Sequence, residues 1–88
     1  MSDTPLADLE ALLAAGAERI VTHGPNSGGV EGYVVSDDAV RAWQSDWEGT
    51  RLDVPIALDE FVRRYASRDH LRAVLEAVRR RLEARRDR

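Results

Sequence analysis

Residues 67–88, SRDHLRAVLEAVRRRLEARRDR, say most about the fold of this chain. Their apolar side chains recur at steps of three and four, which places them on one stripe of a helix: Leu71, Val74, Leu75, Val78 and Leu82. Arg, Asp and Glu fill most of the other positions. An amphipathic helix is stable mainly through the packing of its apolar face, so this segment must cover its stripe with the rest of the chain or with a partner.

Two shorter helices are predicted upstream. Thr4 caps the first, and Pro5 stands in its first turn, where the missing N–H of proline costs nothing. Gly16 ends this helix in the left-handed conformation. Residues 58–65 carry apolar side chains at helical spacing and form the second, and Ser67 is expected to cap the C-terminal helix. A single kinked helix over both segments is the alternative.

A further helix is predicted over residues 36–49. Ser36 is a capping residue, and two aspartates follow it in the first turn, where they favour the helix dipole. Val40, Trp43 and Trp47 recur at i, i+3 and i+7. The two indoles are therefore expected on one helix face, with core packing as the main interpretation and exposure of one of them at an interface as the alternative.

Residues 19–35 are predicted to form a β-hairpin. β-Branched residues mark both strands, and GPNSGG at 24–29 has the composition of a six-residue turn. Gly32 indicates a bulge or the close approach of another element. The sequence thus predicts an α+β fold, one domain over residues 1–88, in which the hairpin packs with three or four helices. Because a two-stranded sheet alone is marginal, edge-to-edge pairing in a homodimer is a further expectation.

Composition limits the classes of function. The chain has 88 residues and no Cys, which excludes thiolate chemistry and disulfides and favours a cytoplasmic, bacterial or phage-encoded protein. No apolar run is long enough to span a membrane. Residues 1–50 hold nine carboxylates and two arginines, net −7, whereas residues 51–88 hold eleven arginines and seven carboxylates, net +4. An acidic first half disfavours a general nucleic-acid coat.

No catalytic, cofactor or metal site is predicted. The glycine loop has the outer glycines of a phosphate-binding loop, but Val30 and Glu31 stand where that loop has its Lys and Ser/Thr. A hairpin tip is the default interpretation, and insertion of Asn26 and Ser27 into a partner is the alternative. His23 borders the loop and could act as a general base, although a surface position is the commoner role of such a histidine.

Two candidate interfaces follow from the charge distribution. The first is an acidic face for a protein partner, with an exposed tryptophan as an anchor, and its residues are Asp37, Asp38, Arg41, Asp46, Trp47 and Glu48. The second is a basic strip near the C-terminus that could contact nucleic acid through Arg79, Arg80, Arg85 and Arg86. A solvated, self-paired arginine face is the alternative to that strip.

Residues 8–43 (DLEALLAAGAERIVTHGPNSGGVEGYVVSDDAVRAW) resemble antitoxins of the Phd/YefM type in their order of elements: helix, strand, turn, strand, helix. The resemblance implies a regulatory protein that binds a toxin. A toxin-immunity protein or a phage inhibitor of a host defence system has the same size and character. The sequence therefore predicts a small non-enzymatic module that regulates or inhibits a protein partner, with a nucleic-acid-binding transcriptional regulator as the alternative.

Overall fold

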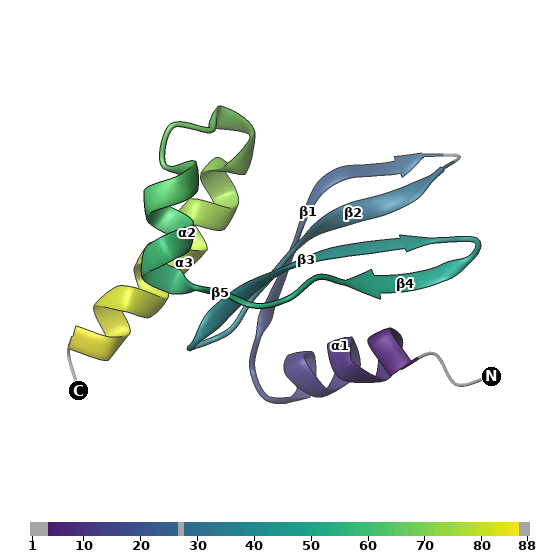
Figure 1. The fold of residues 1–88 in the computed structure, drawn as a ribbon, viewed down its shortest axis with the longest axis horizontal. Coiled ribbons are helices and arrows are strands. Elements are labelled where there is room, and N and C mark those ends of the chain that lie inside the picture. Colours follow the sequence, from purple (N-terminus) through teal and green to yellow (C-terminus); the bar gives the residue numbers. More distant parts are fainter. Residues whose placement is uncertain (1–3, 27, 87–88) are drawn as a thin grey trace.

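The structure is a computed structural model that describes residues 4–26 and 28–86, apart from the side chains of residues 25 and 26. The fold is α+β, as predicted (Figure 1). One antiparallel sheet is formed by β1 (Glu18–Asn26), β2 (Gly29–Val35), β3 (Ala39–Asp46), β4 (Gly49–Leu52) and β5 (Ile56–Ala57). The helices are α1 (Thr4–Ala14), α2 (Leu58–Tyr65) and α3 (Arg72–Arg86), with a short 3-10 turn, η1 (Asp69–Leu71), before α3.

The sheet is a meander in the order β1-β2-β3-β4, and β5 pairs with the first part of β3. The predicted hairpin is confirmed, but its strands continue into the glycine loop, because Asn26 pairs with Gly29. Gly32 lies where β1 leaves no room for a side chain on β2. A Cβ atom on Gly32 would lie 1.9 Å from the carbonyl oxygen of Ile20, so the close approach expected from the sequence is present.

The helices cover opposite faces of the sheet. Val35 and Val40 belong to the core under α2 and α3, whereas Val34 and Trp43 belong to a smaller core with Leu9 of α1. Neighbouring residues of a strand point to opposite faces, so the two cores lie on the two sides of the sheet. Phe61 of α2 is fully buried in the larger core and contacts the rings of Tyr33 and Tyr65. Figure 1 shows the α2–α3 hairpin at one end of the sheet and α1 beneath β3 and β4.

The stripe of the C-terminal helix is packed in cis. Leu71, Val74, Leu75 and Val78 are buried against the sheet and α2, and Leu82 packs at the edge of the same core. The C-terminal boundary of α1 also follows the sequence, since the helix ends at Ala14 and Gly16 has φ 102°. Thr4, predicted as the cap, is the first residue of the helix. Among the described residues, no helix has the length and apolar character needed to cross a membrane.

The prediction of a helix over residues 36–49 is wrong. Residues 36–38 form the β2–β3 turn, residues 39–46 form β3, and residues 47–48 form the turn before β4. The Ser36 hydroxyl accepts a hydrogen bond from the Ala39 N–H at 3.2 Å, as a helix cap would, but here it closes a turn between strands.

Ser67 is not a helix cap either. Arg68 precedes η1 without a side-chain cap, and the chain bends at residues 66–68 between α2 and α3.

Candidate functional site

The residues predicted to form one acidic face lie at two ends of β3. Asp37 and Asp38 are in the turn that enters β3, and Asp46, Trp47 and Glu48 are at the turn that leaves it. An eight-residue strand is about 25 Å long, so these groups form two separate patches and not one cluster. The two ends of β3 must be considered separately.

At the first end, the arginines of α3 pair with the turn. Arg81 donates from Nη1 to Asp37 Oδ1 at 2.8 Å and from Nη2 to the Gly16 carbonyl at 2.8 Å. Only 21% of the Arg81 side chain is exposed. Arg85 lies 3.9 Å from Asp38, whose side chain is 91% exposed. Asp37 therefore holds α3 against the sheet, whereas Asp38 is largely open to solvent.

The predicted basic strip is divided in the same way. Arg80 pairs with Glu18 at 3.2 Å, and Arg85 is close to Asp38. Arg79 borders a separate hollow of about 250 Å³ at the α2–α3 bend, and Arg86 is exposed near the end of α3. The four arginines proposed for nucleic-acid contact do not form a continuous strip free of carboxylates.

Arg41 has a local role within the described structure. Its Nε donates to the carbonyl oxygen of Asp53 at 2.8 Å, and the side chain is half-buried. This bond ties β3 to the connector after β4.

At the second end, Trp47 is the most exposed large apolar side chain in the described residues, at 85%, whereas Trp43 is 5% exposed. Asp46 Oδ1 accepts a hydrogen bond from the Glu48 N–H at 2.9 Å, and Gly49 adopts φ 134°. These features fix a tight turn that presents the indole to solvent. We call residues 46–49 the Trp47 tip.

The β1–β2 turn lies beside the Trp47 tip. Val30 pairs with Ser45, and a Cβ on Gly29 would lie 2.9 Å from the Asp46 Cβ. The backbone of Asn26 pairs with Gly29, so Asn26 lies at the same end of the sheet as the Trp47 tip. The Asn26 side chain and Ser27 lie outside the described residues.

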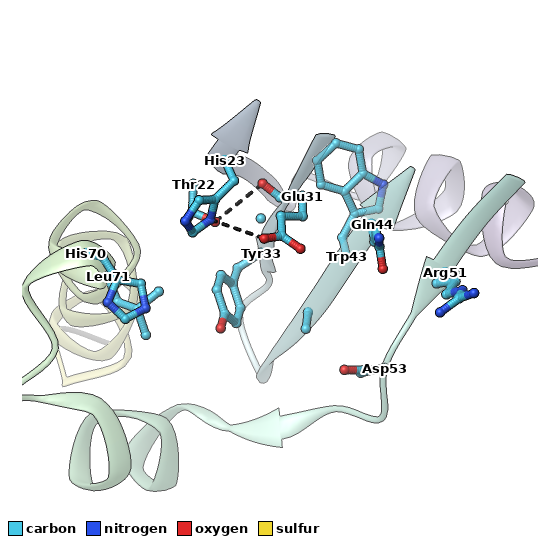
Figure 2. A pocket seen from close by; sticks show the side chains of 12 residues that line it. Thr22, His23, Glu31, Tyr33, Trp43, Gln44, Arg51, Asp53, His70 and Leu71 are labelled. Carbon is cyan, nitrogen blue, oxygen red and sulfur yellow. Dashed lines mark hydrogen bonds and ion pairs between the residues drawn. The ribbon is translucent and has the colours of Figure 1, made fainter. Parts of the chain in front are cut away.

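A groove of about 430 Å³ lies on the sheet face that α2 and α3 leave partly uncovered (Figure 2). The floor is formed by β2 and β3, one wall by η1 and β1, and the other wall by β4 and the residue after it. The main polar groups of its lining are His23, Glu31, Tyr33, Gln44, Arg51 and His70. A narrower hollow shares His23, Glu31 and Gln44 and leads to Gly28 and Gly29, so the groove extends toward the β1–β2 turn.

His23 lies close to groove residues of β1, β2 and η1. Its Nδ1 lies 3.2 Å from Glu31 Oε1 and 3.2 Å from Thr22 Oγ1, and its ring centroid is 6.4 Å from that of His70. Figure 2 shows the two imidazoles on the same wall of the groove, His23 from β1 and His70 from η1. In the described part of the chain, no three His, Asp or Glu residues are arranged to hold a metal ion.

Tyr33 stands on the floor of the groove. Burial, and then the neighbouring Tyr65, Glu31 and Asp53, raise the pKa of the Tyr33 hydroxyl above its usual value of 10.0. The hydroxyl is therefore neutral at physiological pH and can donate or accept a hydrogen bond. The guanidinium of Arg51 on the opposite wall has no ion pair within the described residues. The groove can thus accommodate an aromatic or polar group and offers a cation at its rim.

Sequence reasoning singled out the Trp47 tip but not the groove. Tyr33, Gln44 and Arg51 come from three strands, and they share one face only because Tyr33 pairs with Ala42 and Gln44 with Arg51. The side chains of residues 31, 33 and 35 share one face of a strand, and this alternation was the signal available in the sequence. The register between the strands was also needed to locate the groove. Comparison of the chain with protein-family models, with curated proteins and with solved structures found no match.

Proposed function

We propose that this protein is a small non-enzymatic module that regulates or inhibits a protein partner, and that Trp47 is its anchor. The observation that carries the proposal is the 85% exposure of this indole on a tight, hydrogen-bonded turn. Covering an indole of about 200 Å² contributes about 4 kcal/mol before the costs of association. Tryptophan is also enriched among the residues that dominate binding energy.

The residues around Trp47 indicate the chemistry of the partner. Asp46 and Glu48 flank the indole, and the Asp46 carboxylate also holds the turn through the Glu48 N–H. A partner that receives this tip would have an apolar pocket with Lys or Arg at its rim, since opposite charges steer association and suppress wrong partners. A cytoplasmic location is part of the proposal and rests on the absence of Cys.

Asp37 and Asp38 have a smaller part in this proposal than in the acidic face that the sequence predicts. Asp37 is engaged by Arg81 within the fold, so its use by a partner would require breaking that pair. Asp38 is largely exposed and is still available to extend a contact.

The test is capture of a partner from the native host lysate on the tagged full chain, with and without nuclease, read by quantitative mass spectrometry. Trp47→Ala is compared with Val54→Ala, because Val54 is also exposed, at 76%, but lies in the connector after β4. We expect one stoichiometric protein that survives nuclease, that Val54→Ala retains and that Trp47→Ala loses. Capture of that protein by Trp47→Ala at the wild-type level would contradict the assignment of the anchor.

The nucleic-acid alternative now has a different set of residues. Arg68, Arg72 and Arg79 border the hollow at the α2–α3 bend, together with Asp69 and Glu76, and none of the three guanidinium groups has an ion pair within the described residues. Recovery of nucleic acid, or of proteins lost on nuclease treatment, would favour this alternative. Three phosphate contacts would make the affinity fall with salt at a logarithmic slope of about −2.7.

A further inference from the structure

We propose that the groove of this chain receives the Trp47 tip of a second copy, so that two copies form a two-fold symmetric dimer with two such contacts. The inference rests on the proposed function in one respect, because Trp47 is the anchor in both, and one indole binds either a second copy or the protein partner at a time. It differs from edge-to-edge strand pairing, which was the form of homodimer expected from the sequence.

The edges of the sheet are poorly suited to pairing with another strand. β1 has two register irregularities, between Val21 and His23 and between His23 and Asn26, and Pro25 lies near its end. β4 has only four residues, and Pro55 follows it. Bulges, prolines and short edge strands are the features by which sheets avoid edge-to-edge association. The uncovered sheet face is therefore the better candidate for a contact between copies.

The groove fits an indole in size and chemistry. Its volume of about 430 Å³ lies within the range of ligand sites, about 300–1,000 Å³. Tyr33, His23 and His70 supply ring surfaces, and Leu71 supplies an apolar wall. An indole placed among these groups would exchange its solvent-exposed surface for aromatic contacts.

The charges of the two surfaces are complementary where they would meet. Glu48 is exposed beside Trp47, and Arg51 is exposed on the groove wall without an ion pair among the described residues. Glu31 also faces the groove, but His23 lies 3.2 Å from its carboxylate. Asp53 is the remaining carboxylate of the groove rim. Arg51 of each copy is thus the natural partner of Glu48 in the other.

The geometry favours a closed pair. The groove and the Trp47 tip lie on the same half of the sheet, because Gln44 on the floor is three residues before Trp47. When two copies face each other in opposite directions, each tip can reach the groove of the other, and both contacts form at once. A stable interface of about 800 Å² per copy would use roughly an eighth of the 6000 Å² surface.

Sedimentation velocity of the full chain over a range from about 1 to about 500 µM tests the proposal. We expect a reversible monomer–dimer equilibrium in the wild type. Trp47→Ala should weaken dimerisation at least about 30-fold. Arg51→Glu should weaken it as well, and adding Glu48→Arg to Arg51→Glu in the same chain should restore it, since a two-fold interface exchanges both charges at once. Val54→Ala is the control and should leave the equilibrium unchanged.

A wild-type chain that stays monomeric throughout this range would overturn the proposal. A dimer that persists with both Trp47→Ala and Arg51→Glu would also overturn it and would point to strand-edge pairing. Failure here is distinguishable from failure of the proposed function. If the chain is monomeric but still captures a nuclease-resistant partner through Trp47, only the dimer proposal is refuted. If the chain forms a Trp47-dependent dimer but captures no partner, only the proposed regulatory function is refuted.

Discussion

The substitution Arg81→Met is expected to lower the free energy of unfolding by about 2 kcal/mol. Methionine keeps an apolar stem over the edge of the core and removes the guanidinium. The guanidinium donates two bonds of 2.8 Å, to Asp37 and to the Gly16 carbonyl, and the side chain is 21% exposed. A hydrogen bond to a charged group contributes about 1.5–3 kcal/mol when buried, and an exposed ion pair contributes about 1 kcal/mol or less. The exposure of the pair places the total near 2 kcal/mol.

Urea denaturation followed by circular dichroism measures this loss. In thermal denaturation of an 88-residue protein, a loss of 2 kcal/mol corresponds to a decrease of about 10 °C in Tm. Arg79→Met is the matched control on the same helix, and it should change stability by less than about 0.5 kcal/mol. A double-mutant cycle with Asp37→Asn should give a coupling energy of about 1 kcal/mol. A loss for Arg81→Met no larger than that of the control would refute the view that this pair holds α3 on the sheet.

The remaining predictions concern two residues of β2. Gly32→Ala should destabilise the fold by at least about 3 kcal/mol in urea denaturation, because the new Cβ would meet a β1 carbonyl at 1.9 Å. Gly16→Ala, which meets no atom within 4 Å, should cost only about 1–2 kcal/mol, and equal losses would argue against the close approach. Tyr33 has a raised pKa, so the folded state holds its proton more tightly than the unfolded state, and stability should fall as pH rises above about 10. Denaturation from pH 8 upward should show a smaller fall for Tyr33→Phe, and an identical fall in both proteins would contradict the stated cause.

The sequence predicted the helices at both ends of the chain because each has one covered face. The stripe of α3 and the caps of α1 are local signals, and the structure contains both elements. For β3 the sequence predicted a helix where the structure has a strand, and the reason is physical. Val40 is buried under the α2–α3 hairpin and Trp43 is buried under α1, so the strand has apolar residues on both faces and loses its alternation. A spacing of three residues was then mistaken for a helical turn.

The turns around β3 carried the same ambiguity. Ser36 binds the N–H of the third residue after it in this turn, and a helix cap makes the same bond. The sequence left open which tryptophan is exposed, since exposure depends on which residues form the turn, and in the structure it is Trp47. The pairing of Asp37 with Arg81 joins residues 44 positions apart and has no local signal in the sequence. The Phd/YefM resemblance depended on a helix after the hairpin, and a strand occupies that position.

The meander order of the sheet has a consequence for how the chain folds. Each of β1 to β4 pairs with its neighbour in sequence, so the loops that must close are short and folding of the sheet should be fast. The bonds that attach α3 span much longer stretches, 62 residues from Arg80 to Glu18 and 65 from Arg81 to Gly16. During synthesis the strands can therefore pair before α3 has left the ribosome, and the arrival of its arginines would complete the native state.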